Sequence, residues 1–170
     1  MELFKGLLNN FLITGCSCIL PLIIGLAMYY ICMKSKNLCK FTFLWNVFEG
    51  VCPLLTIMIM YFCILRKVQL NPLLVCIIGF TISFIGYMPT RFNNKDSLIK
   101  NLAVNGIGLI SSIFKWSFCA SFIGVKDMLG VARILYVRTF EVYYLLLPFA
   151  ISIGIVFVLE IMKFVIKEKM

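Results

Sequence analysis

Long apolar runs separated by short polar breaks dominate the chain. A membrane-spanning helix needs about 20 mainly apolar residues. Five windows meet this requirement: 8–33, 41–65, 70–90, 102–125 and 142–163. The breaks between them are too short to build a core of their own, and no linker or repeat divides the chain. The pattern predicts an all-α integral membrane protein, with five transmembrane helices in a single transmembrane domain over residues 1–170.

The second window is less regular than the others. Glu49-Gly50 and Pro53 interrupt its apolar pattern. Proline disturbs a helix because it lacks the backbone N–H and clashes with the preceding turn. We therefore expect residues 41–48 to lie along the inner membrane interface before the chain turns into the bilayer.

The composition supports the membrane class and excludes several others. Hydrophobic residues make up 62% of the chain and the mean hydropathy is +1.04, which leaves too little polar surface to cover a water-soluble domain. No two of the 8 cysteines form a C-x-x-C pair, and the chain has no histidine. We therefore expect no metal site, and cysteines that pack between helices as free thiols.

Basic residues decide the orientation, because lysine and arginine accumulate on the cytoplasmic side of membrane proteins. With the N-terminus outside, most of them fall on the inner side: Lys34, Lys36, Lys40, Arg91, Lys95, Lys100, Lys163, Lys167 and Lys169. The outer side then holds a smaller set: Lys5, Arg66, Lys67, Lys126, Arg133 and Arg138. We expect a cytoplasmic C-terminus, and we attribute the net charge of +9 to topology and contact with anionic lipid rather than to nucleic acid.

Small residues recur at helical spacing in two windows, as in helices that pack closely inside a bilayer. The first set is Thr14, Cys18, Pro21 and Gly25, and the second is Cys76, Gly79, Ser83 and Gly86. We expect both faces to contact other helices.

The fourth window contains a charge on a small polar face. Gly108, Ser111, Ser112, Lys115 and Cys119 follow one another at spacings that place them on one side of a helix. Lys115 lies ten residues from both Asn105 and Val125, about 15 Å deep at 1.5 Å per residue. A charge at that depth costs on the order of 3 kcal/mol or more in lipid. Lys115 is therefore predicted to face a cavity, a water path or a partner carboxylate.

Two roles for this lysine remain open. It can form an ion pair that orients helices, with Glu49 or a carboxylate of another subunit as partner. Alternatively, Ser111, Ser112, Lys115 and Glu49 can line a substrate path. A Ser-Lys catalytic dyad fits the spacing, but no oxyanion-hole motif accompanies it and helix packing explains the serines equally well. The chain is therefore not expected to be an enzyme.

Three segments resemble the permease subunits of polar amino-acid ATP-binding-cassette (ABC) importers of the histidine and glutamine type. Residues 115–127 (KWSFCASFIGVKD) are similar to that family's LLKDTSLASVIGV segment, and residues 138–146 (RTFEVYYLL) to its RTFEP and YLL segments. Residues 47–55 (VFEGVCPLL) are similar to its FRGTPLL segment. Lys115 aligns with a lysine of the family, whereas Trp116 replaces its aspartate and Glu49 its arginine.

The chain departs from the family in the inner loop between the third and fourth spans. In the family this loop carries an E-A-A-x-x-x-G pattern whose short helix docks into the ATPase. Residues 87–105 contain no such pattern and are too few for the usual loop. Arg91, Lys95 and Lys100 are the basic residues left to contact an ATPase there, and a solvated inner loop is the simpler interpretation.

The resemblance implies a permease subunit in a bacterial inner membrane, crossing it several times. Its partners would be a second permease subunit, cytoplasmic ATP-binding subunits and an extracytoplasmic solute-binding protein. The chain itself has no phosphate-binding G-x-x-x-x-G-K-[ST] loop, so ATP would be bound by the separate partner and the chain would carry no cofactor. Because the docking loop is shortened, a degenerate partner in a heterodimer is favoured over a homodimer. The alternative is a small membrane scaffold or passive pore, no longer coupled to ATP hydrolysis.

Overall fold

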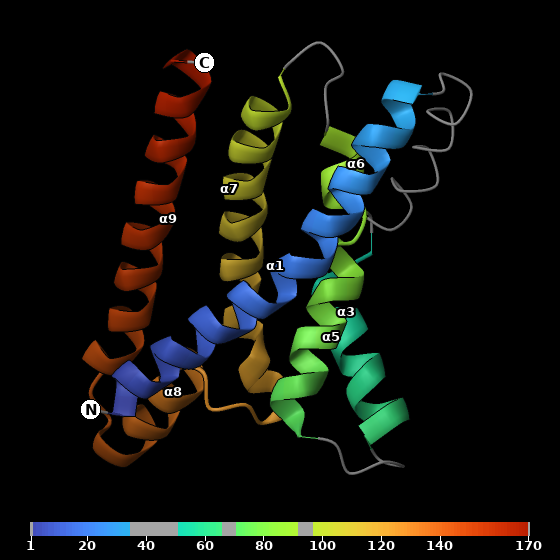
Figure 1. Ribbon diagram of the computed structural model, residues 1–170. Coiled ribbons are helices and arrows are strands. Elements are labelled where there is room, and N and C mark those ends of the chain that lie inside the picture. Colours follow the sequence, from blue (N-terminus) through green and yellow to red (C-terminus); the bar gives the residue numbers. More distant parts are fainter. Residues whose placement is uncertain (1, 35–50, 66–70, 92–96, 170) are drawn as a thin grey trace.

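The computed structural model describes residues 2–34, 51–65, 71–91 and 97–169. Within these ranges every regular element is a helix and no strand occurs. Successive long helices run in alternating directions, and the start of α1 and the finish of α9 lie at opposite ends of the molecule (Figure 1). The all-α prediction is therefore confirmed for this part of the chain.

The helices follow one another as α1 (Glu2–Lys34), α3 (Pro53–Met60), the π-helix η2 (Tyr61–Leu65), α5 (Pro72–Phe84), α6 (Tyr87–Arg91), α7 (Leu98–Ser117), the 3-10 helix η3 (Phe118–Ile123), α8 (Met128–Thr139) and α9 (Tyr143–Lys169). By length and composition, four segments can cross a membrane: Glu2–Ile31, Pro72–Arg91, Leu98–Ile123 and Tyr143–Glu168. They match the first, third, fourth and fifth predicted windows.

The second predicted window has a different outcome. Its described part begins a helix at Pro53, as the interrupted pattern indicated, but Pro53–Cys63 is a shorter apolar helix that is not among the four candidate spans. Residues 41–50, including the segment expected at the inner interface, lie outside the described residues. The described structure thus contains four candidate spans where the sequence predicts five.

Local side-chain chemistry fixes where several helices begin. Asn71 Oδ1 accepts a hydrogen bond from the backbone N–H of Leu73 at 3.0 Å, at the start of α5. Ser97 Oγ accepts one from the backbone N–H of Lys100 at 3.3 Å, at the start of α7. Such caps satisfy backbone N–H groups that have no partner in the first helical turn.

The two predicted small-residue faces are buried, as expected: Thr14, Cys18, Pro21, Gly25, Cys76, Gly79, Ser83 and Gly86. A methyl group on Gly79 would lie 3.0 Å from Ile57 Cγ1, so α3 and α5 approach closely at this glycine. Ser17 Oγ donates to the carbonyl of Ile77 at 3.2 Å and joins α1 to α5. These faces form the helix contacts that the sequence predicts.

Helix α8 was not predicted, since its residues lie between the fourth and fifth predicted windows. Asp127 caps it through a hydrogen bond of 2.6 Å from the backbone N–H of Gly130 to Oδ1. Met128, Val131 and Ala132 are its buried residues, at the i, i+3 and i+4 spacing of one helix face. The cap and this spacing are the sequence signals that identify the helix.

The N-terminal part of α1 rests directly on the start of α8. A methyl group on Gly6 would lie 2.7 Å from Met128 Cα and 2.8 Å from the Asp127 carbonyl oxygen. One turn further along, Asn9 Nδ2 donates to the carbonyl of Lys126 at 2.9 Å. Only a residue without a side chain fits this approach, because the obstructing atoms belong to the backbone.

We predict that Gly6→Ala lowers the free energy of unfolding by roughly 1–3 kcal/mol, the usual cost of overpacking. The matched control is Gly15→Ala in the same helix, where a methyl group meets nothing within 4 Å. Thermal unfolding in detergent or nanodiscs measures the difference. Equal stability of the two variants would show that α1 and α8 do not pack this closely.

Asp127 carries a carboxylate in an enclosed position, outside the candidate spans. Its exposed fraction is 0%, and burial raises its pKa from 3.8 to about 7, although the backbone hydrogen bond from Gly130 and the charge of Arg133 act in the opposite direction. The folded protein therefore binds this proton more tightly than the unfolded chain does. Stability from this group is greatest below about pH 4 and decreases as the pH rises toward 7.

We predict that Asp127→Asn removes this part of the pH dependence, because asparagine also caps helices but does not ionise. The measurement is the unfolding temperature of the wild type and the variant between pH 5 and pH 8. The wild type should lose stability across this interval relative to Asp127→Asn. Parallel curves would mean that Asp127 does not titrate there.

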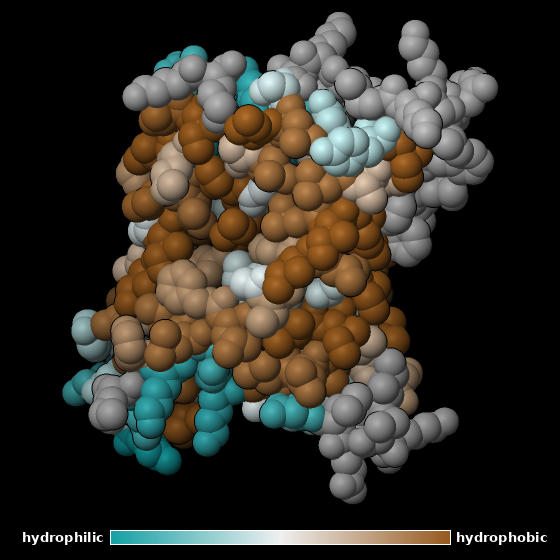
Figure 2. Space-filling model, viewed as in Figure 1, coloured by the Kyte–Doolittle hydropathy of each residue, from teal (hydrophilic) through white to brown (hydrophobic). Residues whose placement is uncertain are grey.

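Helix α9 lies at the periphery. Only 6% of its span window is buried, against 56% for the window Pro72–Arg91. Figure 2 shows a broad apolar surface between two polar ends of the molecule. In the single chain, α9 contacts α7 and α8, and most of its surface is left exposed along its whole length.

Candidate functional site

The most unusual polar contact in the apolar region joins α7 and α9, which run antiparallel to each other (Figure 1). Ser111 of α7 is 1% exposed, and its Oγ donates to Glu160 Oε1 of α9 at 3.3 Å. Both residues lie within candidate spans. A carboxylate thus lies between two candidate membrane-spanning helices, and ionised groups within such helices mark functional positions or partner contacts.

A lysine on the next turn of α9 pairs with this carboxylate. Lys163 Nζ lies 3.5 Å from Glu160 Oε2. The Glu160 side chain is 45% exposed and that of Lys163 is 32% exposed. The pair is therefore accessible from one side, and it is not enclosed within the chain.

The polar contacts continue from Lys163 toward α6. A methyl group on Gly108 would lie 3.6 Å from Lys163 Nζ and 2.7 Å from Tyr87 Oη, so this glycine brings both groups to the surface of α7. Arg91 Nη1 donates to Tyr87 Oη at 3.1 Å, and its guanidinium lies 4.0 Å above the Tyr87 ring. Polar groups of α6 and α9 thus lie on either side of Gly108, near the carboxylate of Glu160.

On the other side of Glu160, Lys115 lines a groove of about 450 Å³ between α7 and α9. The other lining residues are Phe118, Ser152, Ile153, Val156, Phe157 and Glu160. Lys115 is exposed, and no hydrogen bond or ion pair holds its ammonium within the described part of the chain. The groove therefore combines apolar walls with one cation and one anion.

This arrangement favours binding over covalent chemistry. Ser111 donates to Glu160, and Ser112 Oγ donates to the carbonyl of Gly108 in its own helix at 2.9 Å. Neither hydroxyl is paired with Lys115, so the geometry of a Ser-Lys nucleophile is not assembled. A cation and an anion on the walls of one groove can instead hold a solute that carries both charges, or charged groups of a second subunit.

The structure places the predicted path residues in different surroundings. Ser111 and Lys115 lie on the α7–α9 face, and Ser112 makes a contact within its own helix. Glu49 lies outside the described residues. Glu160, which the sequence analysis did not single out, is the carboxylate that lies beside Ser111.

Of the predicted ATPase-contact residues, the structure describes Arg91 and Lys100, at the end of α6 and in the first turn of α7. Arg91 closes α6, where its carbonyl accepts from Asn105 Nδ2 at 3.0 Å, and Lys100 lies in the first turn of α7. Lys95 lies outside the described residues, with the rest of residues 92–96. In the described ranges, no group of three His, Cys, Asp or Glu side chains is close enough to hold a metal ion.

Comparison of the sequence with protein-family models and with curated proteins finds no match. Comparison of the structure finds a chain from the crystal structure of an amino acid ABC transporter with histidines. The TM-score is 0.76 at 16% sequence identity, and the similarity covers 99% of this chain and 94% of the other. At this identity the likeness establishes the fold, which both chains share over nearly their full lengths.

Proposed function

We propose that this chain is the membrane-spanning permease subunit of an ABC-type amino-acid importer. The observation that supports it best is a fold shared along the whole chain with one from an amino acid ABC transporter. The segments around Lys115 and Arg138 resemble the same kind of protein independently of that likeness. A fold alone does not define an activity, so the argument also depends on the α7–α9 face.

The proposed topology has five crossings, with α3 and η2 as the second. The alternating directions of the helices in Figure 1 favour it, because α1 starts and α9 finishes at opposite ends. The N-terminus is placed outside and the C-terminus in the cytoplasm, by the positive-inside rule. The membrane is a bacterial inner membrane.

A second permease subunit covers the α7–α9 face in this proposal. Lys115, Glu160 and Lys163 cannot face lipid without a cost of several kcal/mol, and α9 is too little buried to shield them. A partner helix and a water-filled path between the subunits remove this cost. The groove then becomes one wall of the path, in which Lys115 attracts carboxylates and Glu160 attracts ammonium groups.

The other partners are two cytoplasmic ATP-binding subunits and a solute-binding protein on the outer side. This chain binds no ATP and no other cofactor in the proposal. Because residues 87–105 lack the docking pattern of the related permeases, the chain is proposed as the degenerate member of a heterodimer. The intact permease would then supply the ordinary coupling to ATP hydrolysis.

We predict that Lys115→Met lowers ATP-dependent amino-acid uptake about ten-fold or more, since hydrogen bonds to charged groups are worth roughly 1.5–3 kcal/mol. The assay is uptake into vesicles that contain the whole transporter. The matched control is Lys167→Met, which removes an exposed lysine near the end of α9. Co-purification of the subunits must be unchanged, so that loss of uptake reports the path and not assembly.

Two outcomes would contradict the proposal. Uptake by this chain with its ATPase alone would exclude the heterodimer. Solute flux that does not depend on ATP, from a chain that associates with neither an ATPase nor a second permease, would instead establish the passive pore.

A further inference from the structure

At the end of the molecule opposite the finish of α9, a cleft of about 530 Å³ lies between the start of α1 and α8. Three cations line it, namely Lys5, Lys126 and Arg138, together with the single carboxylate of Glu2. The rest of its lining includes the apolar side chains of Leu8, Val131 and Ile134. The cleft thus has apolar walls and an excess of positive charge.

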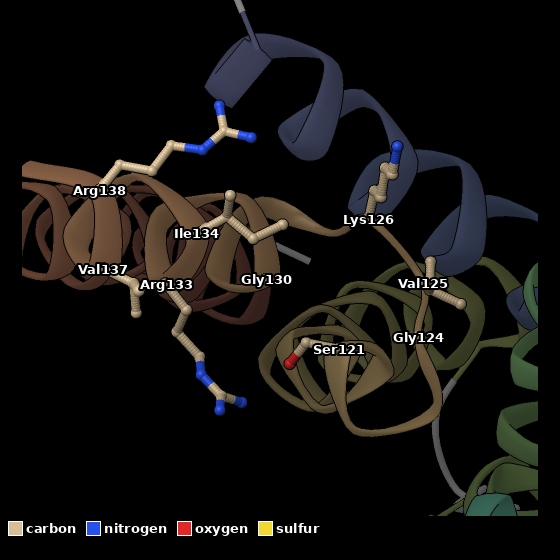
Figure 3. A pocket seen from close by; sticks show the side chains of 9 residues that line it. All are labelled: Ser121, Gly124, Val125, Lys126, Gly130, Arg133, Ile134, Val137 and Arg138. Atoms are coloured by element: carbon tan, nitrogen blue, oxygen red, sulfur yellow. The ribbon is translucent and has the colours of Figure 1, made fainter.

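The cations in this cleft are available to a ligand. Lys5, Lys126 and Arg138 are all exposed, and none of them forms an ion pair within the ranges that the structure describes. Figure 3 shows Lys126 and Arg138 extending toward α1, whereas Arg133 extends from the other side of α8. Lys126 and Arg138 also line an adjoining hollow of about 480 Å³. Three cations beside one carboxylate leave an excess of positive charge, which attracts an anion.

The cleft lies at the boundary of the apolar region. The adjoining hollow includes Ser121, near the end of the candidate span Leu98–Ile123, and the next candidate span begins at Tyr143. Tyr143 is 60% exposed, and tyrosines at the end of a span belong to the level of the lipid headgroups. Figure 2 shows polar residues gathered directly beside the apolar surface at this end.

Exposed apolar residues beside the cations favour a lipid over an acidic protein. Val137 and Phe140 are 66% and 78% exposed, and they flank Arg138. Cations combined with exposed apolar side chains are typical of segments that lie in the membrane interface. Basic pockets between transmembrane helices on the cytoplasmic side of membranes bind the headgroups of anionic lipids, and we expect the same chemistry of this cleft on the proposed outer side. An acidic protein would need only the cations of the cleft, and it would leave the apolar side chains beside them without a partner.

We propose that the cleft between α1 and α8 binds the phosphate of an anionic phospholipid. The planar guanidinium of Arg138 matches two phosphate oxygens, and the ammonium groups of Lys5 and Lys126 act as point charges around them. Leu8, Val131 and Ile134 then contact the glycerol and upper acyl region. The bound lipid bridges α1 and α8, the two helices that already meet at Gly6.

The test is native mass spectrometry of the full chain, with any subunits that co-purify, titrated with phosphatidylglycerol or phosphatidylcholine. The wild type should bind phosphatidylglycerol more tightly. The double variant Lys126→Gln/Arg138→Gln should weaken this binding about 25-fold, at about five-fold for each cation removed. The hydrogen bond from Asn9 is kept, because it uses the backbone carbonyl of Lys126.

The matched control is Lys167→Gln, which removes an exposed cation at the other end of the molecule and should bind phosphatidylglycerol like the wild type. Equal weakening in Lys167→Gln, or equal affinity of the wild type for the two lipids, would overturn the proposal. A third arm uses inorganic phosphate alone. If inorganic phosphate binds as tightly as phosphatidylglycerol, the cleft is a site for a free anion and the proposal of a lipid site is wrong.

Discussion

Placing charge in an apolar medium is the constraint on which this structure depends. Glu160 is held by Ser111 and Lys163 where α9 packs against α7. Lys115 lies beside them without a partner in the described residues. Ionised groups at this depth are stable only beside water or other protein. The face they form is therefore incomplete in a single chain, and the proposed assembly follows from that incompleteness.

Helix α1 gives this face a rigid support. It contacts α5, α6, α7 and α8, and small residues let it approach two of them closely, at Gly6 and at Ser17. The shared fold with a chain of an amino acid ABC transporter persists at 16% identity. Packing of this kind requires small residues at a few positions and apolar residues elsewhere, so many sequences satisfy it.

The sequence predicts where the long helices lie along the chain better than it predicts which helices and side chains contact one another. Four apolar windows coincide with candidate spans because length and hydropathy are local properties. In the described part of the second window a helix begins at Pro53, but it is too short to count as a candidate span. Helix α8 was missed because its 12 residues are too short to span a membrane and the burial of its apolar face depends on α1. Lys115 could be singled out from its own helix, whereas the role of Glu160 depends on a contact with a residue 49 positions away.

The shallow burial of α9 has a consequence for the life of the chain in the cell. Little of this helix is buried against the rest of the chain, so the chain on its own holds it weakly. Chaperones and proteases continuously remove proteins that are only marginally stable. If the proposed second permease subunit covers α9, the abundance of this chain would follow the supply of that subunit.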